Sequence, residues 1–226
     1  MLGWTMSVLV KICGINSAQA ADAALRARAD YAGLVFHSGS PRNLQPAQAR
    51  SLADRMRGRI RLVALVADAS DGHIEAAMNA CKPDYLQLHG SESPDRAAQL
   101  RARFNVPVIK AIPVADASDF AAVPAYEQLA DMLMFDAKAP ANAARPGGHG
   151  AAFDWQLLRG RSFSRPWILA GGLNAGNLAR AIQSSGARIV DASSGVESAP
   201  GAKDPAKIAA FVAAARSAHL TEEARA

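Results

Sequence analysis

The sequence contains few of the residues that mark several common protein classes. Only two of its 226 residues are cysteines, Cys13 and Cys81, which is too few for a disulfide scaffold and favours a reducing compartment. Aromatic residues make up 6% of the chain, so a surface that stacks the bases of single-stranded nucleic acid is not expected. No group of cysteines, histidines and carboxylates has the spacing of a metal site. We therefore expect no bound metal.

Long apolar stretches are absent as well. No run of 18 apolar residues exists, so we expect no membrane span, and the first ten residues lack the basic and apolar segments of a signal peptide. We therefore expect a cytoplasmic protein. The net charge of +5 is compatible with a nucleic acid or with a small anionic substrate. The densest basic stretch, residues 50–61, is typical of a solvated helix end and loop, so we expect no nucleic-acid partner.

Half of the residues are hydrophobic, and many of them fall into short runs at regular intervals. Several runs, such as residues 62–67, are almost continuously apolar rather than alternating. Strands that are buried on both faces have this pattern, which therefore predicts a parallel sheet. The predicted strands cover residues 8–13, 31–36, 60–67, 84–88, 106–112, 132–136, 166–170 and 188–191.

Alanine-rich segments with helical periodicity lie between these strands, and helix-capping residues mark several of their starts. The expected caps are Ser17, Asp71, Ser93, Asn174 and Asp204. A helix over residues 116–125 is interrupted by Pro124, and residues 137–152 form a long irregular loop with three glycines and two prolines. The remaining predicted helices cover residues 17–28, 45–57, 72–80, 93–103, 174–185 and 204–218.

Eight strand–helix units in 226 residues correspond to about 28 residues per unit, which is the size expected for the α/β fold called the (β/α)8 or TIM barrel. An open doubly wound sheet with fewer strands is the alternative. No linker divides the chain. We therefore predict one catalytic domain over residues 8–217, a short N-terminal extension over residues 1–7 and a C-terminal tail over residues 218–226.

Barrel enzymes carry their sites at the carboxyl ends of the strands, and glycine-rich turns follow the last two predicted strands. Backbone N–H groups of such turns and of helix starts bind phosphate oxygens. Ordinary tight turns are the alternative, but their joint presence after strands 7 and 8 favours a phosphate site. The candidate phosphate-binding residues are Gly171, Gly172, Ser193, Ser194 and Gly195.

Cys13 and Asp136 end the first and sixth predicted strands. A lone cysteine is often only a small buried hydrophobic residue, and Asp136 could instead cap a helix or pair with Lys138. Placed across one barrel opening, however, a thiol and a carboxyl group supply a base and an acid for proton transfer. We therefore predict that both are catalytic, whereas Cys81, at a helix end, is structural.

Four further residues at strand ends are candidates for binding the substrate. Arg42 follows the second strand, and its planar guanidinium suits a carboxylate, although an exposed surface charge is the alternative. His89 could bond either a ligand or the backbone. Gln87 and Asp191 lie at the ends of strands 4 and 8.

Taken in order, these segments resemble the phosphoribosylanthranilate isomerases of tryptophan biosynthesis over nearly the whole chain. The matching segments are Lys11-Ile12-Cys13-Gly14, Ser40-Pro41-Arg42, Leu86-Gln87-Leu88-His89-Gly90, Phe135-Asp136, Gly147-Gly148, Leu169-Ala170-Gly171-Gly172-Leu173 and Asp191-Ala192-Ser193-Ser194-Gly195-Val196-Glu197.

The resemblance implies a cofactor-free Amadori rearrangement of N-(5-phosphoribosyl)anthranilate, a small phosphorylated substrate. It implies that Cys13 is the general base, that Asp136 is the general acid, and that Arg42 holds the anthranilate carboxylate. The sequence departs from the family at His149, where a hydroxyl residue is usual, and in an insertion over residues 141–145. These differences concern the sixth loop rather than the acid–base pair.

Two other functions remain as alternatives. A ribulose-phosphate epimerase would need metal-binding histidines and aspartates at the strand ends, and these are not found. A barrel that only binds a phosphorylated metabolite is a second possibility, which the presence of both Cys13 and Asp136 disfavours. No long exposed apolar stripe is evident, so we expect a monomer, with a homodimer as the alternative.

Overall fold

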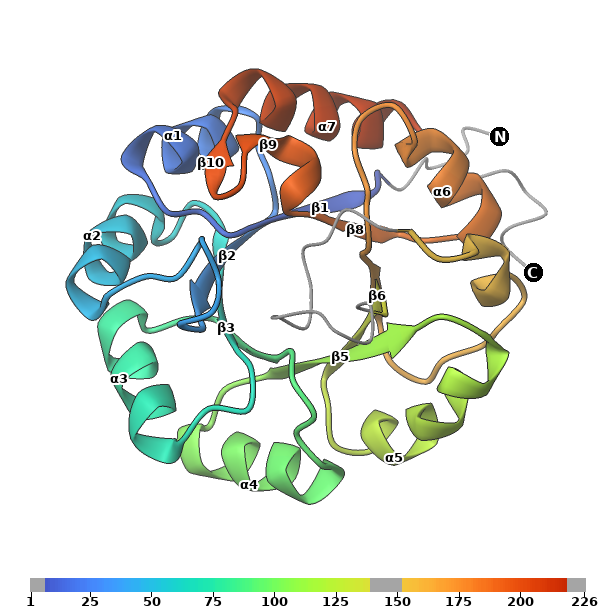
Figure 1. Ribbon diagram of the computed structural model, residues 1–226, viewed down its shortest axis with the longest axis horizontal. Helices are drawn as coiled ribbons and strands as arrows, with labels where there is room; N and C mark the ends of the chain where they lie inside the picture. The colour runs from blue at the N-terminus through green and yellow to red at the C-terminus, as the bar shows by residue number, and fades with distance from the viewer. Residues whose placement is uncertain (1–6, 139–151, 219–226) are drawn as a thin grey trace.

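Eight parallel strands alternate with helices and close into a barrel in the computed structural model, which describes residues 7–138 and 152–218 (Figure 1). The closed order β1 to β8 confirms the predicted (β/α)8 barrel and excludes the open doubly wound sheet. The strands are β1 (Leu9–Cys13), β2 (Tyr31–Phe36), β3 (Arg61–Val66), β4 (Tyr85–Leu88), β5 (Val108–Val114), β6 (Met132–Ala137), β7 (Trp167–Leu169) and β8 (Ile189–Ala192).

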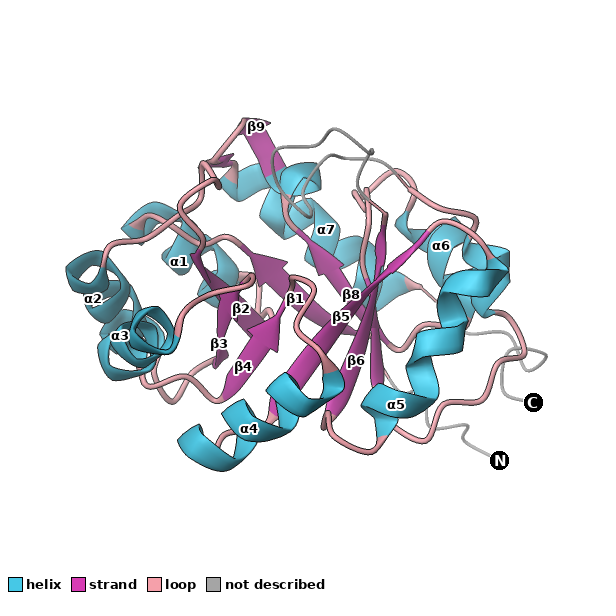
Figure 2. Cartoon of the chain, turned by 60° about the horizontal axis from the view of Figure 1, so that its bottom comes forward, coloured by secondary structure: helices cyan, strands magenta, loops and turns pink. Residues whose placement is uncertain are grey.

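The barrel closes where β8 pairs with β1, and this pairing places Lys11 in register with Asp191. Because all eight strands are parallel, their carboxyl ends meet at one end of the barrel, here called the mouth. A short antiparallel hairpin of β9 (Glu197–Ala199) and β10 (Ala202–Lys203) stands at this end (Figure 2). This hairpin was not predicted from the sequence.

A ring of helices surrounds the barrel (Figure 1). The helices are α1 (Ala18–Arg26), α2 (Pro46–Met56), α3 (Asp71–Cys81), α4 (Pro94–Phe104), α5 (Val123–Glu127), α6 (Leu178–Ser185) and α7 (Pro205–Ser217), with the shorter 3₁₀ helices η1 (Ala117–Ala122), η2 (Trp155–Leu158) and η3 (Ser194–Val196). Only the 3₁₀ helix η2 stands in the sixth unit among the described residues, and the predicted helix over 116–125 is divided into η1 and α5.

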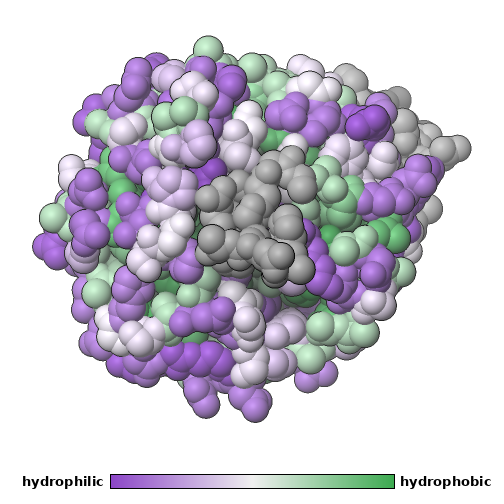
Figure 3. Space-filling view, viewed as in Figure 1, coloured by the Kyte–Doolittle hydropathy of each residue, from purple (hydrophilic) through white to green (hydrophobic). Residues whose placement is uncertain are grey.

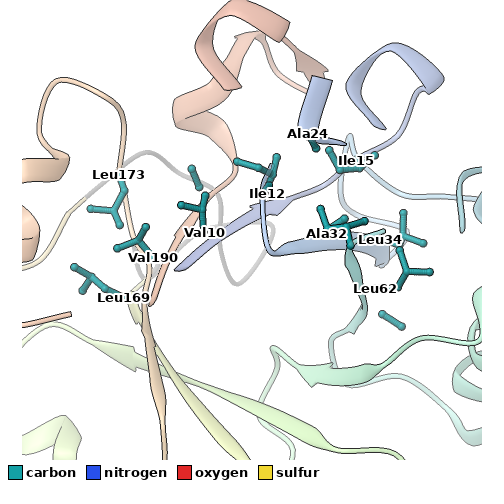
Figure 4. Close-up of a cluster of buried hydrophobic side chains, with 14 of the residues drawn as sticks. Val10, Ile12, Ile15, Ala24, Ala32, Leu34, Leu62, Leu169, Leu173 and Val190 are labelled. Atoms are coloured by element: carbon teal, nitrogen blue, oxygen red, sulfur yellow. The ribbon is translucent and has the colours of Figure 1, made fainter. Parts of the chain in front are cut away.

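Strand side chains alternate between the barrel interior and the layer beneath the helices. On β1, Val10 and Ile12 belong to the large apolar cluster beneath the helices, whereas Cys13 packs in a separate small cluster with Val35 and Leu65. Figure 4 shows part of the larger cluster, including residues from β1, β2 and β8. The wall of the barrel therefore presents one apolar face and one face available for polar groups.

Local capping chemistry sets most helix starts as predicted. The side chains of Ser17, Ser93 and Asp204 accept hydrogen bonds from backbone N–H groups in the first turns of α1, α4 and α7. Two predictions were wrong. Ser70 rather than Asp71 caps α3, because Asp71 is already its first helical residue.

The second wrong prediction concerns Asn174. Its side chain accepts hydrogen bonds from the N–H groups of Gly176 and Asn177, and α6 begins only at Leu178. Asn174 therefore stabilises a turn that precedes the helix, because its short amide side chain bonds the backbone two and three residues ahead.

Several predictions fall on segments outside the described residues. These are most of the extension over residues 1–7, the tail beyond residue 218, His149, the insertion over residues 141–145 and most of the loop over residues 137–152. Within the described ranges, no helix has the length and apolar character needed to span a bilayer.

Candidate active site

A pocket of about 930 Å³ opens at the mouth of the barrel, a volume within the range of small-molecule sites. The segments that follow β2 to β6 line it, and their polar side chains include Asp68, His73, His89, Lys110 and Asp136. In the space-filling view, hydrophilic side chains predominate around the rim of the molecule, with hydrophobic ones between them (Figure 3).

A buried thiol, ammonium and carboxylate come together where β1 meets β8. Nζ of Lys11 lies 2.8 Å from Oδ1 of Asp191, and the Lys11 side chain is fully buried. Cys13 lies two residues further along β1 and therefore faces the same way. Gly33 on β2 makes room for both groups, since an added Cβ would lie 2.9 Å from Sγ of Cys13 and 3.3 Å from Nζ of Lys11. Any larger residue at position 33 would displace one of them.

The protonation of this group follows from burial and from its neighbours. Burial raises the pKa of the Cys13 thiol, and the positive charges of Lys11 and Lys203 reduce that rise without cancelling it. Burial alone would lower the pKa of Lys11, but the charges of Asp191 and Cys13 outweigh it, so the pKa of Lys11 is raised. Lys11 is therefore charged at neutral pH.

Arg42 reaches the β9–β10 hairpin from the segment between β2 and α2. Its Nε and Nη2 atoms donate to Oε1 and Oε2 of Glu197 at 2.6 and 2.8 Å, which is a bidentate pair. Nζ of Lys203 donates to Oε1 of the same carboxylate at 2.6 Å and to the backbone oxygen of Ser193 at 2.9 Å. Two buried cations thus share one buried carboxylate.

Burial and the charges of neighbouring residues shift the pKa values of Glu197 and Lys203 in opposite directions. Burial would raise the pKa of Glu197, but the hydrogen bond from Arg42 and the charge of Lys203 outweigh it, so the pKa of Glu197 is lowered. Burial lowers the pKa of Lys203, and the attraction of Glu197 offsets that change only in part. The Glu197 carboxylate is therefore ionised well into the acid range.

Asp136, at the end of β6, is held by two groups. Its Oδ1 accepts the N–H of Ala137 at 2.8 Å, and its Oδ2 lies 3.2 Å from Nε2 of His89. On the other side of the imidazole, Nε2 of Gln87 lies 2.9 Å from Nδ1. Because an amide nitrogen only donates, Nδ1 accepts and the ring proton lies on Nε2, facing Asp136. The alternative partner Lys138 instead pairs with Asp119 at 2.9 Å.

The turns after β7 and β8 lie against each other. An added Cβ at Gly195 would be 1.9 Å from the carbonyl oxygen of Leu173, so only glycine fits. Gly171 and Gly172 have φ values of +88° and +62°, a conformation that glycine adopts without strain. Within the described part of the chain, the N–H groups of Gly172, Ser194 and Gly195 donate to no acceptor. Amides in this state are suitable donors for an anion.

Among the predicted site residues, His89 and Asp136 line the pocket. The others lie on or after the barrel strands outside its lining, with Cys13 and Asp191 on the adjacent strands β1 and β8. His89 contacts Gln87 and Asp136 rather than the backbone. Arg42 is buried against Glu197, so the alternative of an exposed surface charge is wrong. Among residues 7–138 and 152–218, no three histidine, cysteine, aspartate or glutamate side chains form a group that could hold a metal ion.

Three buried charged residues of the site were given no role from the sequence, namely Lys11, Glu197 and Lys203. A signal was present for Lys11, because it interrupts the apolar strand Leu9–Cys13 and a buried lysine needs a partner. Glu197 and Lys203 carried no comparable signal, since their burial depends on the hairpin that joins them.

A closed (β/α)8 barrel with a polar pocket and ionisable groups gathered at its mouth defines the class of barrel enzymes. The comparisons with known proteins give the family. Residues 10–214 match the family model of N-(5'phosphoribosyl)anthranilate (PRA) isomerase. The N-(5'-phosphoribosyl)anthranilate isomerase of Cereibacter sphaeroides (strain ATCC 17029) is 52% identical over 209 residues, covering 92% of this chain and 99% of the relative. The chain therefore belongs to the N-(5'-phosphoribosyl)anthranilate isomerase family.

Solved structures agree with this assignment. The phosphoribosyl anthranilate isomerase of Thermotoga maritima superposes with a TM-score of 0.81 at 32% identity, over 92% of this chain and 98% of that structure. A phosphoribosyl anthranilate isomerase in complex with reduced 1-(o-carboxyphenylamino)-1-deoxyribulose 5-phosphate has a TM-score of 0.78 at 30% identity, with the same coverage of both chains.

Proposed function

We propose that this protein converts N-(5-phosphoribosyl)anthranilate into 1-(2-carboxyphenylamino)-1-deoxyribulose 5-phosphate without a cofactor, as an isomerase of tryptophan biosynthesis. The observation that carries the proposal is the placement of one thiol and one carboxyl group, Cys13 on β1 and Asp136 on β6, near the carboxyl ends of barrel strands. This placement occurs in a chain that the family model spans over residues 10–214.

Asp136 acts as the general acid in the first step. It donates a proton to the ring oxygen of the ribose, the bond from that oxygen to C1 breaks with its electron pair moving to the oxygen, and the anthranilate nitrogen forms a C=N bond to C1. His89 and the Ala137 N–H point at the two oxygens of Asp136. They stabilise the carboxylate that remains after the transfer, and Gln87 holds His89 in the required orientation.

Cys13 acts as the general base in the second step. Its thiolate removes the proton from C2, the electrons of that C–H bond form a C1=C2 bond, and the C=N electron pair returns to nitrogen. The resulting enolamine gains a proton at C1 and loses one from its C2 hydroxyl group, so the ketone product forms with no net change in protons. Cys13 then releases its proton to solvent and Asp136 takes one up, which restores both groups for the next turnover. General acid–base groups each contribute about 10²–10⁴ in rate.

Three groups bind the substrate around these two. Arg42 holds the anthranilate carboxylate through Nη1, because Nε and Nη2 are engaged by Glu197 and Nη1 donates to no described residue. Oδ2 of Asp191 accepts a hydrogen bond from a sugar hydroxyl group, since Oδ1 already accepts one from Lys11. The phosphate group is bound by Ser193 and by the amides of the turns after β7 and β8, at Gly171, Gly172, Ser194 and Gly195.

The partner of this protein is a small phosphorylated molecule. We propose that the protein is a monomer, because no long exposed apolar stripe is evident in its sequence. Both cysteines are free thiols, which suits the reducing environment of the cytoplasm. Light scattering of the active protein measures the oligomeric state, and a mass of two chains would show a dimer instead.

The decisive experiment mixes the purified protein with freshly generated phosphoribosylanthranilate and follows the loss of the fluorescence of the anthranilate group. We expect enzyme-dependent turnover in the presence of a metal chelator. Ribulose 5-phosphate serves as the control substrate for the epimerase alternative. No turnover of phosphoribosylanthranilate would refute the proposal, and turnover of ribulose 5-phosphate would favour the epimerase.

A further inference from the structure

Cys13 lies among buried charges that do not balance. The cations are Lys11 on β1, Arg42 after β2 and Lys203 on β10, and the anions are Asp191 on β8 and Glu197 on β9. Each carboxylate is paired, Asp191 with Lys11 at 2.8 Å and Glu197 with both Arg42 and Lys203 at 2.6 Å. The five groups therefore carry one excess positive charge, which a thiolate at Cys13 would balance.

The position of the sulfur makes this charge relevant to Cys13. Sγ of Cys13 and Nζ of Lys11 both lie within 3.3 Å of the point where a Cβ of Gly33 would stand. The stem of Arg42 lies beside Gly14, the residue that follows Cys13. The other neighbours of the sulfur, Val35 and Leu65 of β2 and β3, are apolar. The charge of Lys11 therefore acts at short range on a largely buried sulfur, and Lys203 adds a second positive charge from β10.

We propose that Lys11 and Lys203 are positioning residues that make a buried thiolate possible at Cys13, each ammonium group being held in place by its own carboxylate. The proposal rests on the proposed role of Cys13 as the general base. It assigns a purpose to two buried lysines that bind neither the carboxylate nor the phosphate group of the substrate in the scheme above. Ionisation of Cys13 releases its proton to solvent, and the thiolate is then balanced by the excess positive charge.

The second cysteine of the chain gives a natural comparison. Cys81 is fully buried at the end of α3, where its Sγ donates to the carbonyl oxygen of Ala77. Burial raises the pKa of Cys81 to about 12. At Cys13 the charges of Lys11 and Lys203 lower the pKa and the charge of Asp191 raises it, whereas at Cys81 the charge of Arg57 lowers it. The two buried thiols therefore have different charged neighbours.

Lys203 also contacts the turn after β8, which belongs to the predicted phosphate site. Its Nζ donates to the backbone oxygen of Ser193 at 2.9 Å and lies 3.3 Å from the Ser193 hydroxyl oxygen, at the start of the turn after β8. Its side chain has no exposed surface. The Lys203 ammonium group therefore links the β9–β10 hairpin to the turn after β8. The same positive charge lowers the pKa of Cys13.

The test titrates the thiolate directly by its far-ultraviolet absorbance, as the difference between each protein and the same protein carrying Cys13→Ser. This subtraction removes the signals of Cys81 and the tyrosines. An opposite charge within about 4–6 Å shifts a pKa by about 1–3 units. We therefore expect Lys11→Met and Lys203→Met each to move the midpoint of Cys13 upward by about one pH unit or more. Lys203→Arg, which keeps the charge, should restore the original midpoint.

Lys207→Met is the matched control. Lys207 also contacts Glu197, through the backbone oxygen at 2.7 Å, but its side chain is exposed, so the midpoint should not move. If Lys203→Met does not fold by circular dichroism, Lys203→Gln carries the test, because its amide still donates to Glu197 and Ser193. Unchanged midpoints in the folded lysine variants, or an equal shift in Lys207→Met, would overturn the proposal. The titration uses no substrate, so a protein without isomerase activity but with these shifts would refute the proposed function and not this inference.

Discussion

The outward and inward faces of the barrel strands are two regions with different chemistry. On the outward face of β2, Ala32, Leu34 and Phe36 are almost completely buried against the apolar layer under the helices. Inside the barrel, by contrast, Lys11, Gln87 and Asp191 are buried together with apolar side chains. Buried ion pairs are inefficient stabilisers compared with apolar residues of similar size. The outward face therefore maintains the fold, whereas the inward face gives up some stability to hold reactive groups in fixed positions.

Removal of the acid or the base should have the largest effect. We expect Asp136→Asn and Cys13→Ala each to lower turnover by about 10²–10⁴-fold, because a general acid or base of this kind contributes that much. Urea unfolding of both variants should give midpoints close to that of the unchanged protein. Cys81→Ala is the matched control, since it removes a buried thiol at the end of α3, and it should retain full turnover. Nearly normal turnover of Asp136→Asn would contradict its assignment as the acid.

The next largest effect should come from the outward face and should appear in stability. Leu34→Ala leaves a cavity beneath the helices, and such changes cost about 2–5 kcal/mol of unfolding free energy. The turnover of the molecules that remain folded should be unchanged, because Leu34 does not face the pocket. Urea unfolding and steady-state kinetics on the same samples measure both quantities. Arg50→Ala, on the exposed side of α2, is the control and should change neither one, since arginine and alanine are both good helix formers. A tenfold loss of turnover at full folding would show that the two faces are not separable in this way.

The difference between the outward and inward faces of the strands also explains how much of the structure could be predicted from the sequence. Apolar periodicity is a local signal that every strand carries, so all eight strands and the closed barrel were predictable. The caps Ser17, Ser93 and Asp204 were predictable for the same reason. Asn174 was misassigned because a side-chain amide stabilises a free turn and a helix start by the same hydrogen bonds.

The inward face was predicted less completely. The catalytic and binding candidates lie at strand ends, so their positions followed from the fold. The side chains that contact these candidates could not be predicted from the fold. Contacts such as that of Arg42 with Glu197 join residues 155 positions apart. The hairpin that buries Lys203 has too few residues to produce a periodic pattern. Spatial pairing of charges, unlike apolar periodicity, has no local signature in one sequence.

A third prediction tests the link between the β9–β10 hairpin and the substrate. Arg42→Lys keeps the positive charge but loses the planar guanidinium that donates to Glu197 and to the proposed carboxylate. Hydrogen bonds to charged groups contribute about 1.5–3 kcal/mol, so KM should rise by about 10–100-fold. The turnover number should fall far less, because Arg42 does not touch the reacting carbon atoms in the proposed scheme. Steady-state kinetics separate the two constants, and an unchanged KM would remove Arg42 from the binding site.

The last prediction distinguishes the two regions by the pH dependence of stability. The pKa of Glu197 is lowered in the folded protein, so its ionisation adds stability that is complete above the unfolded value of about 4.3 and is lost as the pH falls through the lower folded value. Glu197→Gln should therefore be less stable at neutral pH, because it leaves the buried cations Arg42 and Lys203 without their shared carboxylate, and the difference should shrink in acid. The deficit of Leu34→Ala should persist over the same range, because no proton is involved. Urea unfolding at several pH values measures both differences. If the Glu197→Gln deficit stayed constant into strong acid, the carboxylate charge would not be its source, and the polar interior would contribute to stability in the same way as the apolar layer outside it.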